Sequence, residues 1–101
     1  MGTVEMDWVT RRHLRIVRHT WRRDPGGRLV AGVVFRNVRQ EDYLAEVRVV
    51  FRDSEGKAEV GPAPPDTQRF PPGETRIEWT SYRPEAAEYC IELSSARAFQ
   101  W

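Results

Sequence analysis

Apolar and polar residues alternate most regularly between residues 43 and 53. Side chains along a β-strand point alternately to its two faces, so this pattern predicts a strand with one buried and one largely solvated face. Residues 53–56 follow as a predicted turn, because Gly56 adopts at little cost the positive φ that a short hairpin needs. The side chains expected to be buried are Tyr43, Ala45, Val47, Val49 and Phe51, and those on the opposite face are Leu44, Glu46, Arg48, Val50 and Arg52.

Related patterns elsewhere predict further strands. Residues 28–37 carry apolar side chains on both faces, which is typical of a central strand. The alternation within residues 14–21 slips near Val17, which indicates a β-bulge. The predicted strands cover residues 14–21, 28–37, 43–53, 57–60, 75–80, 88–93 and 98–101.

Turn-forming residues separate these strands. Residues 24–27 and 71–74 combine Asp, Pro, Gly and Glu as tight turns do, and residues 39–42 are a polar loop. Residues 61–66 contain three prolines, which lack the N–H that a strand ladder requires. We expect an extended surface loop of polyproline character there.

About seven short strands, with turn signals roughly every ten residues, predict an all-β fold, namely a two-sheet antiparallel sandwich. Stacking the two apolar faces removes both from water, and a small closed barrel would satisfy the same requirement. No helical period is present. We expect residues 1–10 to form a loose N-terminal arm and residues 11–101 a single β-sandwich domain. Its predicted core includes Val47, Val49, Phe51, Ile77 and Ile91, together with Trp21 and Trp79.

The order of these signals resembles the immunoglobulin-like sandwich domains of the FxLYD family of bacterial and archaeal proteins. The resemblance spans roughly residues 14–93 and is carried by residues 31–38, 47–57 and 70–79. In the motif that names the family, Asp53 matches literally, while Val49, Phe51 and Arg52 replace its other residues. The resemblance implies an immunoglobulin-like fold in a family not known for enzymatic activity, and it allows a surface-associated protein.

Composition narrows the remaining possibilities. The chain has 101 residues, of which 40% are hydrophobic and 31% charged, as in an ordinary globular domain. Its single cysteine, Cys90, excludes an intrachain disulfide. Because no apolar run reaches the length of a signal peptide or a membrane helix, we expect a soluble, cytoplasmic protein without a membrane partner.

The net charge of +1 conceals an arginine-rich stretch over residues 11–28, which contains seven arginines and only one acidic residue, an aspartate. Arginine binds phosphates, and aromatic rings stack on bases, so this stretch suggests a site for single-stranded nucleic acid or another anion. The alternative is the solvated face of an edge strand, where charges discourage aggregation. The candidate site residues are Arg11, Arg12, Arg15, Arg18, Trp21, Arg22 and Arg23.

The sequence predicts no catalytic residues, no metal site and no cofactor. His13 and His19 are expected to be exposed strand histidines, too far apart to share one metal ion. Cys90 lies on the face of its strand opposite Tyr89 and Ile91, without an adjacent base or helix that would favour a thiolate. The Asp and Glu residues of this protein are scattered along the sequence and form no evident catalytic pair.

We therefore predict a non-enzymatic interaction or structural module. Its partner is expected to be another protein or a second copy of the chain, with no small-molecule substrate. Exposed Val30, Val34 or Val50 would supply the apolar patch for self-association. The alternative function is single-stranded nucleic-acid binding by residues 11–28.

Overall fold

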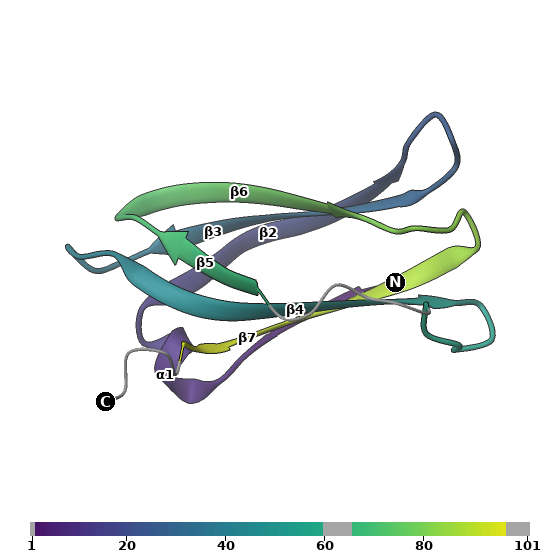
Figure 1. Cartoon of the computed structure of the whole chain (residues 1–101). Coiled ribbons are helices and arrows are strands. Elements are labelled where there is room, and N and C mark those ends of the chain that lie inside the picture. The colour runs from purple at the N-terminus through teal and green to yellow at the C-terminus, as the bar shows by residue number, and fades with distance from the viewer. Residues whose placement is uncertain (1, 60–65, 97–101) are drawn as a thin grey trace.

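The computed structural model describes residues 2–59 and 66–96, and in this part of the chain two β-sheets pack face to face (Figure 1). One sheet has four strands in the order β1-β7-β4-β5, and the other has three in the order β2-β3-β6. The elements are β1 (Gly2–Met6), α1 (Trp8–Arg11), β2 (Leu14–Arg23), β3 (Leu29–Asn37), β4 (Tyr43–Asp53), β5 (Asp66–Phe70), β6 (Gly73–Thr80) and β7 (Ala86–Ser95).

The predicted two-sheet sandwich is confirmed. Most neighbouring strands are antiparallel, as expected, but β1 pairs with β7 in parallel, with Val4 opposite Ile91. A wholly antiparallel arrangement was therefore a wrong detail. The chain crosses from the end of β1 through α1 into the other sheet, so β1 forms no hairpin with β2 and pairs instead with the distant strand β7.

The alternation predicted for residues 43–53 is confirmed in β4. Tyr43, Ala45, Val47 and Phe51 are buried, while Val49 is half-buried and packs against the same core. Ile91 is fully buried, and Ile77 and Trp79 pack against the core as half-buried residues. The inner faces of both sheets therefore meet in one apolar interior.

Strand β3 is the central strand that its two apolar faces predicted. It lies between β2 and β6, and eight of its nine residues are buried. The register of β2 against β3 shifts between Ile16 and Arg18, which confirms the bulge expected near Val17. At the end of β3 the amide of Asn37 donates to the carbonyl oxygens of Glu41 and Phe70, both at 2.8 Å.

The loose arm expected for residues 1–10 was wrong for the residues that the structure describes. Residues 2–6 form β1, and α1 follows directly. Asp7 caps this short helix by accepting a hydrogen bond from the Thr10 N–H at 2.8 Å. Its second oxygen accepts from the Ser95 N–H at 3.1 Å, which joins the cap to the end of β7. No described helix is long and apolar enough to cross a membrane.

The contact between Gly2 and Tyr89 helps to hold β1 in place. The Tyr89 ring lies so close to Gly2 that any side chain at this position would overlap it. The Tyr89 hydroxyl is hydrogen bonded to Nδ1 of His19 at 2.7 Å, which links β7 to β2 in the other sheet. A strand with only two inward apolar side chains, Val4 and Met6, is thus fixed by contacts that come from distant residues.

Strand β5 was also missed, because its residues carry no clear alternation. It pairs with β4 over Tyr43–Val47 and begins at Asp66, which was expected to be part of a loop. Of the strand expected over residues 57–60, the described part holds an isolated bridge between Arg52 and Ala58. Val60, the proline-rich residues 61–65 and the strand expected at 98–101 lie outside the described residues.

The turns at residues 24–27 and 53–56 form as predicted. The Gly27 and Gly56 N–H groups donate to the carbonyl oxygens of Asp24 and Asp53, at 2.9 and 3.0 Å. Both glycines have a positive φ, of 84° and 83°. Residues that carry a Cβ atom rarely adopt a positive φ, which explains why glycine occupies both positions.

Candidate interaction surface

The outer face of the β2-β3-β6 sheet is covered with arginines. Every second residue of these strands points away from the interior, and register aligns them in rows across the sheet. Arg18, Val34 and Arg76 make one row, and Arg15, Arg36 and Glu74 make another. The outward charged residues are Arg15, Arg18 and Arg22 from β2, Arg36 from β3, and Glu74, Arg76 and Glu78 from β6. Five positive charges thus face two negative ones.

Two valines lie beneath these arginines. Val30 and Val34 point outward from β3 but are 3% and 7% exposed. Long arginine side chains can cover apolar surface with their methylene groups and keep the guanidinium in water. The apolar patch that these valines were expected to provide is therefore wrong, and the surface presented to a partner is cationic. Val50, on the other sheet, is half-buried.

Ion pairs leave part of the positive charge on this face uncompensated. Glu78 contacts Arg22 at 3.4 Å and Arg76 at 3.2 Å, and Glu74 contacts Arg36 at 2.9 Å. All of these side chains are well exposed, so each pair contributes little to stability. Among the described residues, Arg18 forms no ion pair. This arginine lies near the middle of β2, opposite Val34.

The structure does not bring the seven candidate residues onto one surface. Arg15, Arg18 and Arg22 share the outer face, and Arg11 and Arg12 lie at the end of α1, where the Arg12 guanidinium is 5.9 Å from the centre of the Trp8 ring. Trp21 and Arg23 alternate with Arg22 and so point to the opposite side of β2. The arginines and the aromatic ring of the predicted site are therefore divided between two sides of one strand.

Trp21 was also wrongly expected in the core. It is 47% exposed, although it points to the inner side of its sheet. Strand β2 is at the edge of the sheet, so Trp21 has a neighbouring strand on one side only, where it lies opposite Ala31 of the buried cluster. The alternation of apolar and polar residues identifies the side of a strand to which a residue points. Whether that side chain is shielded from water depends on the strands that pack around it.

Sequence reasoning missed two members of the basic face, Arg36 and Arg76. Their signal was present, because each alternates with inward apolar residues in its own strand, as Arg76 does with Ile77. Their placement beside β2, however, depends on strand order, and local sequence carries no information on that.

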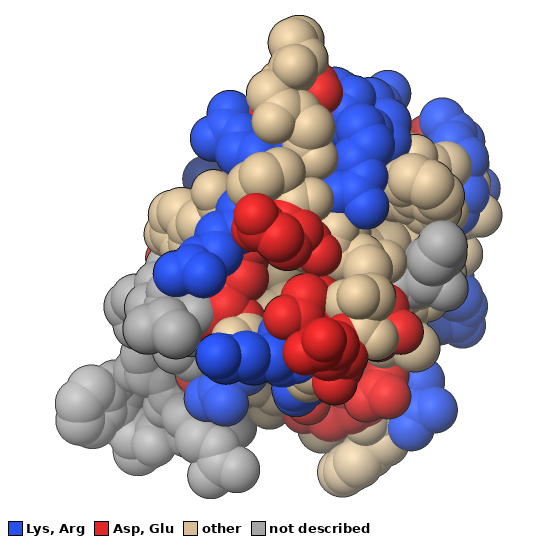
Figure 2. Space-filling view, turned by 90° about the vertical axis from the view of Figure 1, so that its right-hand side faces the viewer, with Lys and Arg blue, Asp and Glu red and all other residues tan. Residues whose placement is uncertain are grey.

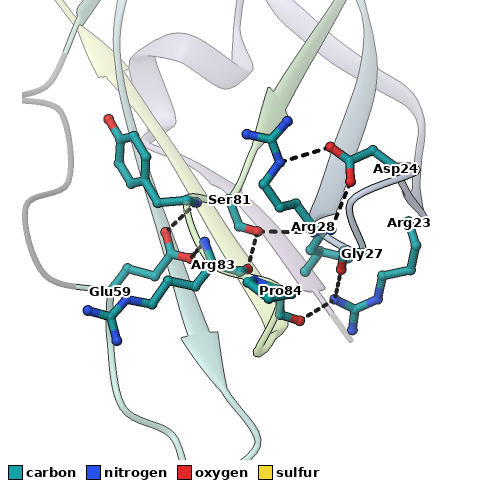
Figure 3. Close-up of polar contacts among 10 residues, drawn as sticks. Arg23, Asp24, Gly27, Arg28, Glu59, Ser81, Arg83 and Pro84 are labelled. Atoms are coloured by element: carbon teal, nitrogen blue, oxygen red, sulfur yellow. Dashed lines mark hydrogen bonds and ion pairs between the residues drawn. The ribbon is translucent and has the colours of Figure 1, made fainter.

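The end of the molecule that holds the β2–β3 turn is built from a separate polar network (Figure 3). Arg23 donates to the carbonyl oxygens of Gly27 and Pro84, at 3.2 and 3.1 Å. Ser81 is 1% exposed; its hydroxyl accepts from the Leu29 N–H and donates to the Arg83 carbonyl oxygen. The Arg23 guanidinium thus joins two loops as a structural link, which removes it further from the predicted binding site.

In the same network, carboxylates accept backbone hydrogen bonds. Glu59 accepts from the N–H groups of Tyr82 and Arg83, at 3.1 and 3.0 Å. Asp24 accepts from the backbone and the side chain of Arg28, both at 2.9 Å. The backbone hydrogen bond from Arg28 is the main reason why the pKa of Asp24 lies below its usual value. These contacts stabilise the loops around the β2–β3 turn.

His13 differs from the exposed strand histidine that was expected, whereas His19 is exposed within β2 as predicted. His13 precedes β2 and stacks on Tyr43, with ring centres 4.4 Å apart, and its buried Nδ1 has no hydrogen-bond partner among the described residues. His19 is exposed and bonded to Tyr89. Burial raises the pKa of the Tyr43 and Tyr89 hydroxyls. Within residues 2–59 and 66–96, no three His, Cys, Asp or Glu side chains are grouped to hold a metal ion.

The outer face of the β1-β7-β4-β5 sheet is acidic along β1 and β7. Glu5 from β1 and Glu88 and Glu92 from β7 point outward and are exposed. Arg48 and Arg52 point outward from the neighbouring strand β4. A shallow hollow of about 450 Å³ lies beside Glu5, Glu46, Arg48 and Glu92. Cys90, half-buried, lies on this same face.

The outer face of the β2-β3-β6 sheet is therefore mainly basic, whereas the other outer face is acidic along β1 and β7 and carries arginines along β4. Figure 2 looks at the end that carries the β2–β3 turn: many Lys and Arg side chains gather in its upper part, where the β2-β3-β6 sheet lies, whereas Asp and Glu lie among further Lys and Arg in the middle and below. A further apolar cleft of about 450 Å³ opens between β4 and β6, lined by Val47, Val49, Phe51, Trp79 and Tyr82 among others.

Comparisons with known proteins support the fold. A crystal structure of Campylobacter jejuni cj0090 matches with a TM-score of 0.81 and 18% identity, over 95% of this chain and 100% of that one. A DUF1425 family member from Shewanella sp. pv-4 matches with a TM-score of 0.69 and 13% identity, over 82% of this chain and 78% of that one. No family model and no curated protein matches the chain. At these identities the likeness shows the fold alone.

Proposed function

We propose that this protein is a non-enzymatic interaction module that binds an acidic surface of a partner protein through the outer face of β2-β3-β6. The observation that carries this proposal is the row of outward arginines on β2, flanked by Arg36 and Arg76, over a layer of covered valines. Guanidinium groups form two parallel hydrogen bonds with carboxylates, so a flat array of them suits a surface rich in Asp and Glu.

The rigidity of this face supports the proposal. Strand β3 is paired on both sides, and its inner face carries the core residues Ala31, Val33 and Phe35. The arginines therefore project from a sheet that cannot rearrange without losing the core. Ordered main-chain positions reduce the conformational entropy lost on binding, although each long arginine side chain still has to be immobilised.

The same geometry favours protein over single-stranded nucleic acid. Bases splayed from a single strand need aromatic rings on which to stack. Trp21, the aromatic residue of the predicted site, points to the other side of β2 from Arg18 and Arg22. A strand bound to the arginines would therefore not meet this ring.

A direct test measures fluorescence anisotropy of two labelled probes, an acidic peptide and single-stranded DNA of equal charge, in salt from about 50 to 300 mM. We expect the peptide to bind at low salt and to be released as salt rises. The variant Arg18→Ala/Arg22→Ala should weaken binding several-fold to about tenfold, because exposed charge pairs are worth about 0.2–1 kcal/mol each. Arg48→Ala, an exposed arginine of the other sheet, is the matched control and should leave binding unchanged.

Two results would contradict the proposal. If neither probe binds at low salt, the arginine face has no role in anion recognition. If DNA binds far more tightly than the peptide, and Trp21→Ala weakens it, the nucleic-acid hypothesis replaces this one.

A further inference from the structure

The arginines of β2 and the glutamates of β7 lie on opposite outer surfaces of the sandwich, one set above the other. Strand β2 lies over β7, because His19 and Tyr89 are hydrogen bonded across the two sheets. Its outward residues Arg18 and Arg22 are thus on one surface, and Glu88 and Glu92 of β7 are on the opposite surface, below them. Strand β2 runs antiparallel to β7, because His19 bonds to Tyr89 and Arg23 bonds to Pro84, so Arg18 lies at about the level of Cys90 and Arg22 at about that of Ala86. A copy displaced along the direction normal to the sheets, and shifted by about two residues along the strands, would bring its arginines against these glutamates.

The spacing of the two sets of charges matches. Arg18 and Arg22 are four residues apart on β2, and Glu88 and Glu92 are four residues apart on β7. At about 3.3 Å per residue, each pair spans roughly 13 Å. Both strands run along the long axis of the sandwich (Figure 1). Two arginines of one copy can therefore meet two glutamates of another at the same time.

These charges form few ion pairs within the molecule, although Arg52 and Arg48 of β4 lie opposite Glu88 and Glu92 in register. Among the described residues, Arg18, Glu88 and Glu92 form no ion pair, and Arg22 has one long, exposed contact with Glu78. Glu5, next to Glu92 in register, is likewise unpaired in this part of the chain. New pairs with a second copy would therefore replace few internal ones.

We propose that the acidic partner of the arginine face is a second copy of this chain, bound through its β1-β7 face. This inference rests on the proposed function and identifies the partner. The contact is head-to-tail, with different surfaces on each copy, so successive copies form an open stack. A symmetric pairing of two arginine faces would place like charges together and is disfavoured.

The size of the faces fits this contact. The two longest dimensions of the molecule are 39 and 27 Å, so one face offers at most about 1,000 Å². Specific interfaces bury about 800 Å² on each partner, so most of the face would have to take part. Because the contact is dominated by exposed charges, we expect weak association that disappears at high salt, where charges are screened within a few ångströms.

The experiment is sedimentation velocity of the whole chain, at increasing protein concentration and at low and high salt. Two charge-reversed variants make the test specific. Arg18→Glu/Arg22→Glu makes both faces acidic, and Glu88→Arg/Glu92→Arg makes both basic. Each variant alone should remain monomeric, while a mixture of the two should assemble again at low salt. Lys57→Glu, in an exposed turn away from both faces, is the control and should behave as the unmodified chain.

The results separate this inference from the proposed function. Stacking is supported if the mixture of the two variants assembles again, and if added salt or the acidic peptide dissociates these assemblies. A monomeric chain at low salt and high concentration that still binds the acidic peptide overturns stacking and leaves the proposed function standing. Assembly that survives reversal of Arg18 and Arg22 also overturns it, because another surface must then be responsible. A monomer that binds no peptide contradicts both proposals.

Discussion

The outer faces of the two sheets are constructed differently. On β3, outward Val30 and Val34 are nearly fully buried, and each lies beside at least one arginine of a neighbouring strand, so this central strand is apolar on both sides. On β4 and β7, outward positions hold Arg48, Glu92 and half-buried Val50, and the face stays mixed. The comparison shows that long charged side chains can extend an apolar layer to the outside of a sandwich while presenting charge to solvent.

The largest expected effect comes from the covered valines. Val34→Ala should lower the free energy of unfolding by about 2 kcal/mol, since burying a valine side chain contributes about 1.5–3 kcal/mol. Val50→Ala on the other outer face should cost less than about 1 kcal/mol, because Val50 is half-buried. Urea denaturation of both variants measures the difference. Equal losses would show that the two outer faces do not differ as described.

A second change tests how the four-stranded sheet holds its outermost strand. Gly2→Ala would overlap the Tyr89 ring, so we expect a loss of about 1–2 kcal/mol, as for other overpacked sites. Hydrogen exchange at the amides of β1 should increase. Thr3→Ala, which changes an exposed neighbour, should have little effect. In a Tyr89→Ala background the cost of Gly2→Ala should shrink, and strict additivity would mean that the ring is not the obstacle.

The smallest expected effect concerns Asp7, which joins α1 to β7. Burial disfavours its charged form, but hydrogen bonds from Thr10 and Ser95 outweigh this, and the net pKa of Asp7 is lowered from 3.8. Its contribution is therefore present above about pH 4 and is lost as pH falls through the lowered pKa. Asp7→Ala should cost about 1 kcal/mol near neutral pH, typical of a helix cap. Unfolding curves of both proteins should converge on acidification; a constant gap would contradict this.

Part of the candidate surface could be predicted from sequence. The sequence named Arg15, Arg18 and Arg22 among the candidate residues, and the slip in alternation identified the bulge near Val17. It did not separate these arginines from Arg23, which points to the other side of β2. It did not place Trp21 correctly, because the exposure of a residue depends on strand order, and β2 is an edge strand. Nor did it predict β1 or β5, since short strands with few apolar residues are stabilised by their partners.

By itself the sequence determined the elements whose cause is local: the alternating strands β3, β4, β6 and β7, and the glycine turns at Gly27 and Gly56. Tertiary structure decided the strand order, the parallel pairing of β1, and which charged residues share each outer face. The physical reason is that alternation and φ preferences act within a few residues. Pairing and cover depend instead on residues far apart in the chain, such as Gly2 and Tyr89, which meet after the sheets have packed.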